Sequence, residues 1–197
     1  MWVCGFTRTV LVAALLSLPT FCVGADEWDQ RNDPSTFYGI TNLAYYPLQG
    51  QEFVPDLARM NIAQLWIDGS YCEDECGSLD LSVRLREESI FGTLLATSEI
   101  QSLASGFRGI VTLNFPDTTL SPGNKYVLEI VLGPYDGLGI WGVVYTSPPS
   151  FEDYERGNRI YDGVVQRIQD LWFREGFAAT VPVANTTWGS IKANYLD

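Results

Sequence analysis

The chain has 197 residues, with 24 acidic against 12 basic side chains, a net charge of −12 at pH 7 and no histidine. Such an acidic chain lacks the positive surface that binding to nucleic-acid phosphates or to anionic membranes requires, so neither partner is expected. The absence of histidine from the sequence also excludes the histidine-based catalytic triads.

The first 25 residues are typical of an export signal. Arg8 is the only charged residue before Asp26, and the apolar run of residues 10–18 is too short to cross a bilayer as a helix. Val23 and Ala25 are small residues at the positions that precede a cleavage site, which predicts cleavage after Ala25. We therefore expect a secreted, extracellular protein without a transmembrane segment in its mature chain. A periplasmic or cell-surface location is the alternative.

The mature chain alternates short strand-like segments with turns. Residues 26–38 are charged and polar, which predicts a loose leader. Alternation of apolar and polar residues, with period two, then predicts strands and their core-facing side chains. The predicted strands are residues 40–48, 51–55, 62–68, 79–87, 92–97, 110–115, 125–132 and 139–145. Residues 125–132 have apolar residues on both faces, which favours a central strand, and a helical turn is expected within residues 98–105.

The segment of residues 159–173 is ambiguous. Its apolar residues also fit a helical stripe, but Gly163 and the β-branched Val164 and Val165 favour two strands, near 159–165 and 168–174. So many short strands at regular spacing predict an all-β fold, a jelly-roll-like antiparallel β-sandwich. The expected domain spans residues 39–175, and residues 176–197 form a tail.

Six segments of the chain, taken in sequence order, carry a resemblance to a known family: residues 51–55, 83–87, 92–98, 120–123, 141–143 and 170–174. In this order they resemble an exported bacterial jelly-roll domain found in surface proteins with PEP-CTERM or choice-of-anchor sorting signals. The resemblance covers about two-thirds of the chain. It implies a jelly-roll-like fold, no known chemistry and no catalytic residue. Relatives often carry a C-terminal anchor, whereas this chain ends in polar residues.

Cys72 and Cys76 are the cysteines that remain after cleavage, and both lie in an acidic loop. In an exported protein such a pair predicts a disulfide bond, since the chain has no histidine to complete a metal site. The same loop offers Asp68, Asp74 and Asp80 as calcium ligands, and an acidic loop exposed to solvent is the alternative. No other cofactor is predicted.

Trp66 and Trp172 give the sharpest functional signal. The alternation that places Leu65 and Phe173 in the core turns both tryptophans to the opposite face. Exposed tryptophans flanked by polar groups suit stacking against sugar rings, so an open face would bind a glycan or an extracellular protein. If another segment covers this face, both side chains are buried instead. The polar residues in the same register are Gln64, Arg84, Arg86, Asp170 and Arg174.

The sequence thus predicts a secreted, non-catalytic module that binds a glycan or a cell-surface partner. One alternative is a purely structural or adhesive protein. The other is a small glycan-active enzyme, in which Glu129 on the central strand supplies one of the two carboxylates that glycoside hydrolysis uses. A solvated Glu129 on the outer face is the simpler interpretation.

Overall fold

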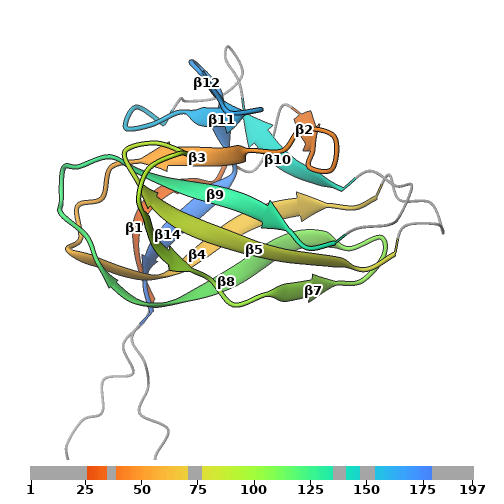
Figure 1. The fold of residues 1–197 in the computed structure, drawn as a ribbon, viewed down its shortest axis with the longest axis horizontal. Coiled ribbons are helices and arrows are strands. Elements are labelled where there is room, and N and C mark those ends of the chain that lie inside the picture. The colour runs from red at the N-terminus through yellow and green to blue at the C-terminus, as the bar shows by residue number, and fades with distance from the viewer. Residues whose placement is uncertain (1–25, 35–38, 71–76, 135–140, 147–153, 179–197) are drawn as a thin grey trace, which may run out of the picture.

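The computed structural model describes residues 26–34, 39–70, 77–134, 141–146 and 154–178. Within these residues every regular element is a β-strand, and fourteen strands form two antiparallel sheets that pack face to face (Figure 1). The predicted all-β sandwich is therefore confirmed. None of the described residues forms a helix with the length and apolarity that crossing a bilayer requires.

The first sheet is built around β4. β8 lies along one edge of β4, whereas β14 and then β10 lie along the other edge. β14 pairs in turn with β1, and β10 pairs with β2 and β13. The strands of this sheet are β1 (Glu27–Asn32), β2 (Gly39–Asn42), β4 (Arg59–Asp68), β8 (Arg108–Thr119), β10 (Gly142–Thr146), β13 (Asp170–Leu171) and β14 (Phe173–Phe177).

The second sheet has the strand order β12-β11-β3-β9-β5-β6, with β7 beside β5. β9 lies between β3 and β5, which confirms the predicted central strand. β11 and β12 form a tight hairpin whose two turn residues, Asp162 and Gly163, both have positive φ, as a type I′ turn requires. The strands are β3 (Gln49–Phe53), β5 (Leu79–Glu87), β6 (Leu94–Thr97), β7 (Gln101–Leu103), β9 (Tyr126–Leu132), β11 (Arg159–Tyr161) and β12 (Val164–Gln166).

The core lies between the two sheets and contains the residues that the alternation placed there. Each strand turns every second side chain inward, so four separate strands contribute rows of apolar residues. The predicted residues found buried in this core are Ala63, Leu65, Ile67, Leu81, Val83, Leu85, Val111, Leu113, Phe115, Tyr126, Leu128 and Ile130.

The expected leader is instead strand β1. Its register on β14 runs from Glu27 opposite Phe177 to Asn32 opposite Phe173. The segment has no apolar alternation, but its polar side chains find hydrogen-bond partners inside the sheet. Asn32 is buried and donates from Nδ2 to the hydroxyl of Thr146 (3.0 Å) and to the carbonyl of Leu171 (2.9 Å). Backbone pairing and these bonds replace the missing apolar burial.

Two other expectations need correction. The helical turn predicted within residues 98–105 is strand β7, which pairs with β5. Residues 159–173 are strands, as predicted, but they form β11, β12 and β13 rather than two longer strands. The interruption occurs near Ile168, which has a φ of 69°. The last strand of the domain, β14, also continues two residues beyond the expected boundary at residue 175.

Candidate functional site

Trp66 and Trp172 come together on the outer face of the first sheet, as predicted. Their ring centroids lie 5.7 Å apart at an interplanar angle of 78°. Trp172, however, is only 2% exposed, and Trp66 is half-buried. The guanidinium of Arg174 lies 5.2 Å from the Trp172 ring and 5.8 Å from the ring of Trp28, which belongs to β1. The segment expected to be loose therefore helps to cover this face, and Trp66 and Trp172 do not form an open platform.

Arg174 is itself neutralised by the protein. Its Nε and Nη2 atoms each lie 2.7 Å from Oδ2 of Asp33, directly after β1. Gln64, another residue of the predicted set, accepts a long hydrogen bond of 3.5 Å from Nη1 of Arg174. Asp33 therefore neutralises the charge of Arg174, and the rings of Trp28 and Trp172 pack against its guanidinium.

Arg84 and Arg86 do not belong to the tryptophan face. Both lie in β5 of the second sheet, so they point to the other outer surface of the sandwich. Glu129 of β9 accepts a 2.6 Å hydrogen bond from Nε of Arg86, and Arg84 approaches it to 3.8 Å. Glu129 is buried, so the expectation of a solvated carboxylate is wrong. Its carboxylate thus forms ion pairs with both arginines.

Asp170 is not on the tryptophan face either, because it lies between the sheets. Its Oδ1 accepts a hydrogen bond from Nε2 of Gln51 (2.8 Å), which belongs to the second sheet, and its Oδ2 accepts from the backbone N–H of Tyr154 (3.0 Å). Gln51 in turn accepts from the N–H of Leu171 (2.7 Å). Asp170 therefore ties the two sheets together.

The predicted calcium loop is only partly described. Asp74, Cys72 and Cys76 lie outside the described residues, as does the expected cleavage site. Asp68 is buried and pairs with Arg108 at 3.1 Å, and Asp80 accepts a hydrogen bond from Ser102. The described residues contain no group of three or more side chains placed to hold a metal ion.

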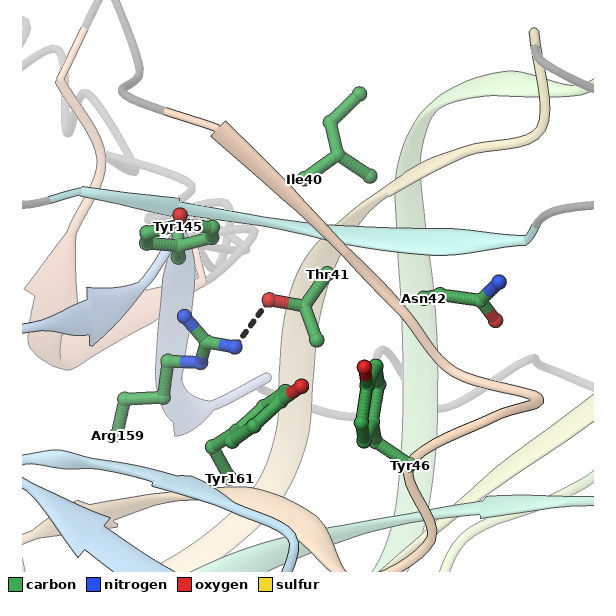
Figure 2. Close-up of a pocket in the computed structure, with 7 residues that line it drawn as sticks. All are labelled: Ile40, Thr41, Asn42, Tyr46, Tyr145, Arg159 and Tyr161. Atoms are coloured by element: carbon green, nitrogen blue, oxygen red, sulfur yellow. Dashed lines mark hydrogen bonds between the residues drawn. The ribbon is translucent and has the colours of Figure 1, made fainter.

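A pocket that the sequence did not reveal lies where β2 of the first sheet approaches β11 of the second. It has a volume of about 370 Å³. We call it the tyrosine pocket, and its lining residues are Ile40, Thr41, Asn42, Tyr46, Tyr145, Arg159 and Tyr161 (Figure 2). β11 places Arg159 and Tyr161 on one face, while Ile160 between them packs against Val127 on the outer face of the second sheet.

Arg159 is the most unusual residue of the tyrosine pocket, because it is charged and only 3% exposed. Its guanidinium carbon lies 4.1 Å from the centre of the Tyr145 ring and 5.0 Å from that of Tyr161. Nη1 donates to the side-chain oxygen of Gln169 (3.1 Å), and Nη2 donates to the hydroxyl of Thr41. Its Nε has no hydrogen-bond partner among the described residues. Burial lowers the pKa of Arg159, and the two neighbouring tyrosines oppose that shift.

Tyr46 and Tyr161 form the wall of the pocket that is open to solvent. Their ring centroids lie 4.6 Å apart, and Figure 2 shows the two rings side by side, with Tyr161 nearer to Arg159. Tyr46 is exposed and Tyr161 is half-buried. Burial, and then a hydrogen bond with Tyr46, raise the pKa of Tyr161 to about 12. The phenol of Tyr161 therefore remains protonated at neutral pH and can donate a hydrogen bond to a ligand.

Glu175 of β14 is another buried ionisable group, and it does not line this pocket. It is 1% exposed, and no cation of the described residues lies within ion-pair distance. Burial, reinforced by the nearby Asp29, raises the pKa of Glu175 to about 9. This carboxyl is therefore neutral at pH 7.

The shared face of Arg159 and Tyr161 and the turn that follows them could in principle be anticipated from the sequence. Arg159 and Tyr161 alternate immediately before an Asp-Gly turn, which is the pattern of a hairpin with a polar and aromatic face. The convergence of Thr41, Tyr145 and Arg159 has no local signal. A scan of the chain against models of known protein families finds no match, and a search of curated proteins finds none that is similar.

Proposed function

We propose that this chain is an exported, non-catalytic β-sandwich module that binds a saccharide in the tyrosine pocket. The observation that carries the proposal is the pair of Tyr46 and Tyr161 rings beside an open pocket of about 370 Å³. That volume falls in the range of small-molecule sites, and tyrosine offers both a flat apolar surface and a hydroxyl donor, which together suit a sugar ring.

The export signal and the resemblance to domains of bacterial surface proteins both support an extracellular setting. The composition of the pocket supports binding rather than hydrolysis. Glycoside hydrolysis generally uses two carboxyl groups that flank the scissile bond, and the lining residues that the structure describes in the tyrosine pocket include none. Glu129, the carboxylate that the sequence suggested for such a reaction, is paired with Arg86 instead.

A structural or adhesive role without a ligand is the alternative. It is favoured by the position of Arg159, which belongs to the second sheet and bonds to Thr41 of the first, so that it joins the sheets at this edge. On that alternative the paired rings of Tyr46 and Tyr161 only shield the arginine from solvent. The two functions differ in what happens when the exposed ring is removed, because Tyr46 contributes little to the interior.

A glycan array probed with the secreted chain tests the proposal. Tyr46→Ala and Tyr161→Ala should each weaken saccharide binding by about tenfold or more, as the loss of a stacking residue does. Tyr45→Ala is the matched control, because Tyr45 is the neighbouring exposed tyrosine and does not line the pocket. Absence of any bound saccharide, or an equal loss in the Tyr45 variant, would contradict the proposal.

A further inference from the structure

Arg159 is an exception in the charge pairing of this protein. Of the ten lysine and arginine residues that the structure describes, eight lie within ion-pair distance of a carboxylate. The two without such a partner are Arg159 and Arg167. Arg167 is exposed, so water solvates its charge. Arg159 is the more demanding case, because it is buried.

The surroundings of Arg159 do not compensate its charge. Thr41 and Gln169 accept its hydrogen bonds with neutral oxygens, and Tyr145 and Tyr161 contribute their ring faces, with Tyr145 also accepting a side-chain hydrogen bond, so none of these groups carries a full negative charge. Cation–π contacts return only part of what a guanidinium loses when it leaves water. An arginine also cannot escape the cost by losing its proton. Among the described residues, which include many acidic side chains, none places a carboxylate within ion-pair distance of Arg159.

We propose that the ligand of the tyrosine pocket carries a carboxylate that pairs with Arg159, and that the saccharide is therefore an acidic sugar of the hexuronate type. This inference rests on the proposed function and names the class of its ligand. The sugar ring would lie against Tyr46 and Tyr161, and its acid group would point toward the guanidinium.

The geometry of the guanidinium suits this pairing. Nε and Nη2 form one of the edges with which arginine binds both oxygens of a carboxylate. In the free protein Nε is without a partner among the described residues, and Nη2 holds only the neutral hydroxyl of Thr41. Binding exchanges that hydroxyl for a charged acceptor as the guanidinium turns toward the pocket. A planar carboxylate matches this edge, and sulfated sugars serve as a test of whether any anion suffices.

The experiment measures the affinity of the secreted chain for oligomers of glucuronate, galacturonate and mannuronate by calorimetry. Each oligomer is compared with its own methyl ester, which has nearly the same shape and no charge, and with sulfated and neutral hexose oligomers. At least one free acid should bind about 10–100-fold more tightly than its ester, as expected for a hydrogen-bonded charge pair. This comparison uses the unaltered protein, so it does not depend on whether a variant folds.

Two variants then locate the effect. Arg159→Met should remove the preference for the acid over the ester, whereas Arg167→Met, which removes the other arginine without a carboxylate partner, should leave it unchanged. Equal binding of acid and ester, or preference for the sulfated oligomers, would overturn the carboxylate inference while the saccharide proposal stands. If no saccharide of any class binds, both proposals fail.

Discussion

Arg174 and Arg159 have nearly the same aromatic surroundings and differ in one partner. Arg174 lies against Trp28 and Trp172, and Arg159 lies against Tyr145 and Tyr161. The protein supplies Asp33 to the first arginine at 2.7 Å and supplies no described carboxylate to the second. The first arrangement is complete and holds β1 on β14. We propose that an anionic ligand completes the second, and for this reason we assign the proposed function to the pocket and not to the tryptophan face.

Glu175 is buried without a cation of the described residues beside it. A carboxyl group that is buried can retain its proton, and the pKa of Glu175 is raised to about 9. Arginine cannot become neutral in this way, because its guanidinium stays protonated at any physiological pH. The proton that Glu175 retains therefore explains its burial without a cation, whereas Arg159 keeps its charge, and we propose that a ligand compensates it.

Trp172→Ala should have the largest effect on stability. Because Trp172 is only 2% exposed and contacts Trp66 and Arg174, its truncation opens a cavity and should cost about 3–5 kcal/mol of unfolding free energy. Urea denaturation measures this cost. Trp66→Ala should cost less, since that side chain is only half-buried. An unchanged midpoint for Trp172→Ala would mean that the tryptophan face is open after all.

Glu175→Gln should change the pH dependence of stability. Between the unfolded-state pKa of 4.5 and the folded-state pKa of about 9, the folded protein keeps a proton that the unfolded chain releases. The stability contributed by this group is complete below pH 4.5 and is lost as the pH rises toward 9. The substitution removes that loss, so at pH 7 the variant should be more stable than the wild type, by on the order of 2–3 kcal/mol.

Denaturation of both proteins at pH 5, 7 and 9 checks this expectation. The general repulsion among acidic residues grows with pH in both proteins, so the difference between them isolates Glu175. Asp29 and Asp56 raise the same pKa, and the backbone N–H of Gln30 lowers it, so these neighbours are left unchanged. Two parallel curves would show that Glu175 is ionised in the folded state.

Asp33→Asn should have a smaller effect and would make Arg174 more like Arg159. The ion pair is partly exposed, with 21% and 29% of the two side chains accessible, so the loss should be about 1 kcal/mol. Thermal melting detects it. Added acetate should not restore stability, because Trp172 is buried and Trp28 of β1 also lies near Arg174 on this face. Restoration by acetate would remove the distinction between the two arginines.

The strands of the core could be predicted because their pattern is local. In β4, β5, β8 and β9 every second residue is apolar, and the structure buries those residues. β1 could not be predicted, because its residues Glu27–Asn32 are mostly polar and gain their place through pairing with β14. Hydrogen bonds of Asn32 to distant residues have no signature in the sequence near it.

The candidate site could not be predicted because alternation shows which face a residue takes but not which sheet its strand joins. Arg84 and Trp66 both point outward, yet they lie on different sheets and so on opposite outer surfaces. For the same reason Arg159 and Tyr145, which are in contact, come from different sheets. Only the packing of the two sheets brings them together.

The most direct test of the proposal that Arg159 pairs with a ligand carboxylate is to introduce a protein carboxylate beside Arg159. Thr41 already accepts a hydrogen bond from Arg159, so Thr41→Asp should place a carboxylate next to the guanidinium. Thr41→Asn is the matched control, because asparagine has nearly the same size as aspartate and carries no charge. The acidic oligosaccharide that the wild type binds is titrated against both variants by calorimetry. We predict that Thr41→Asn keeps the wild-type affinity within about threefold and that Thr41→Asp weakens it by about tenfold or more. Equal affinities of the two variants would contradict the account.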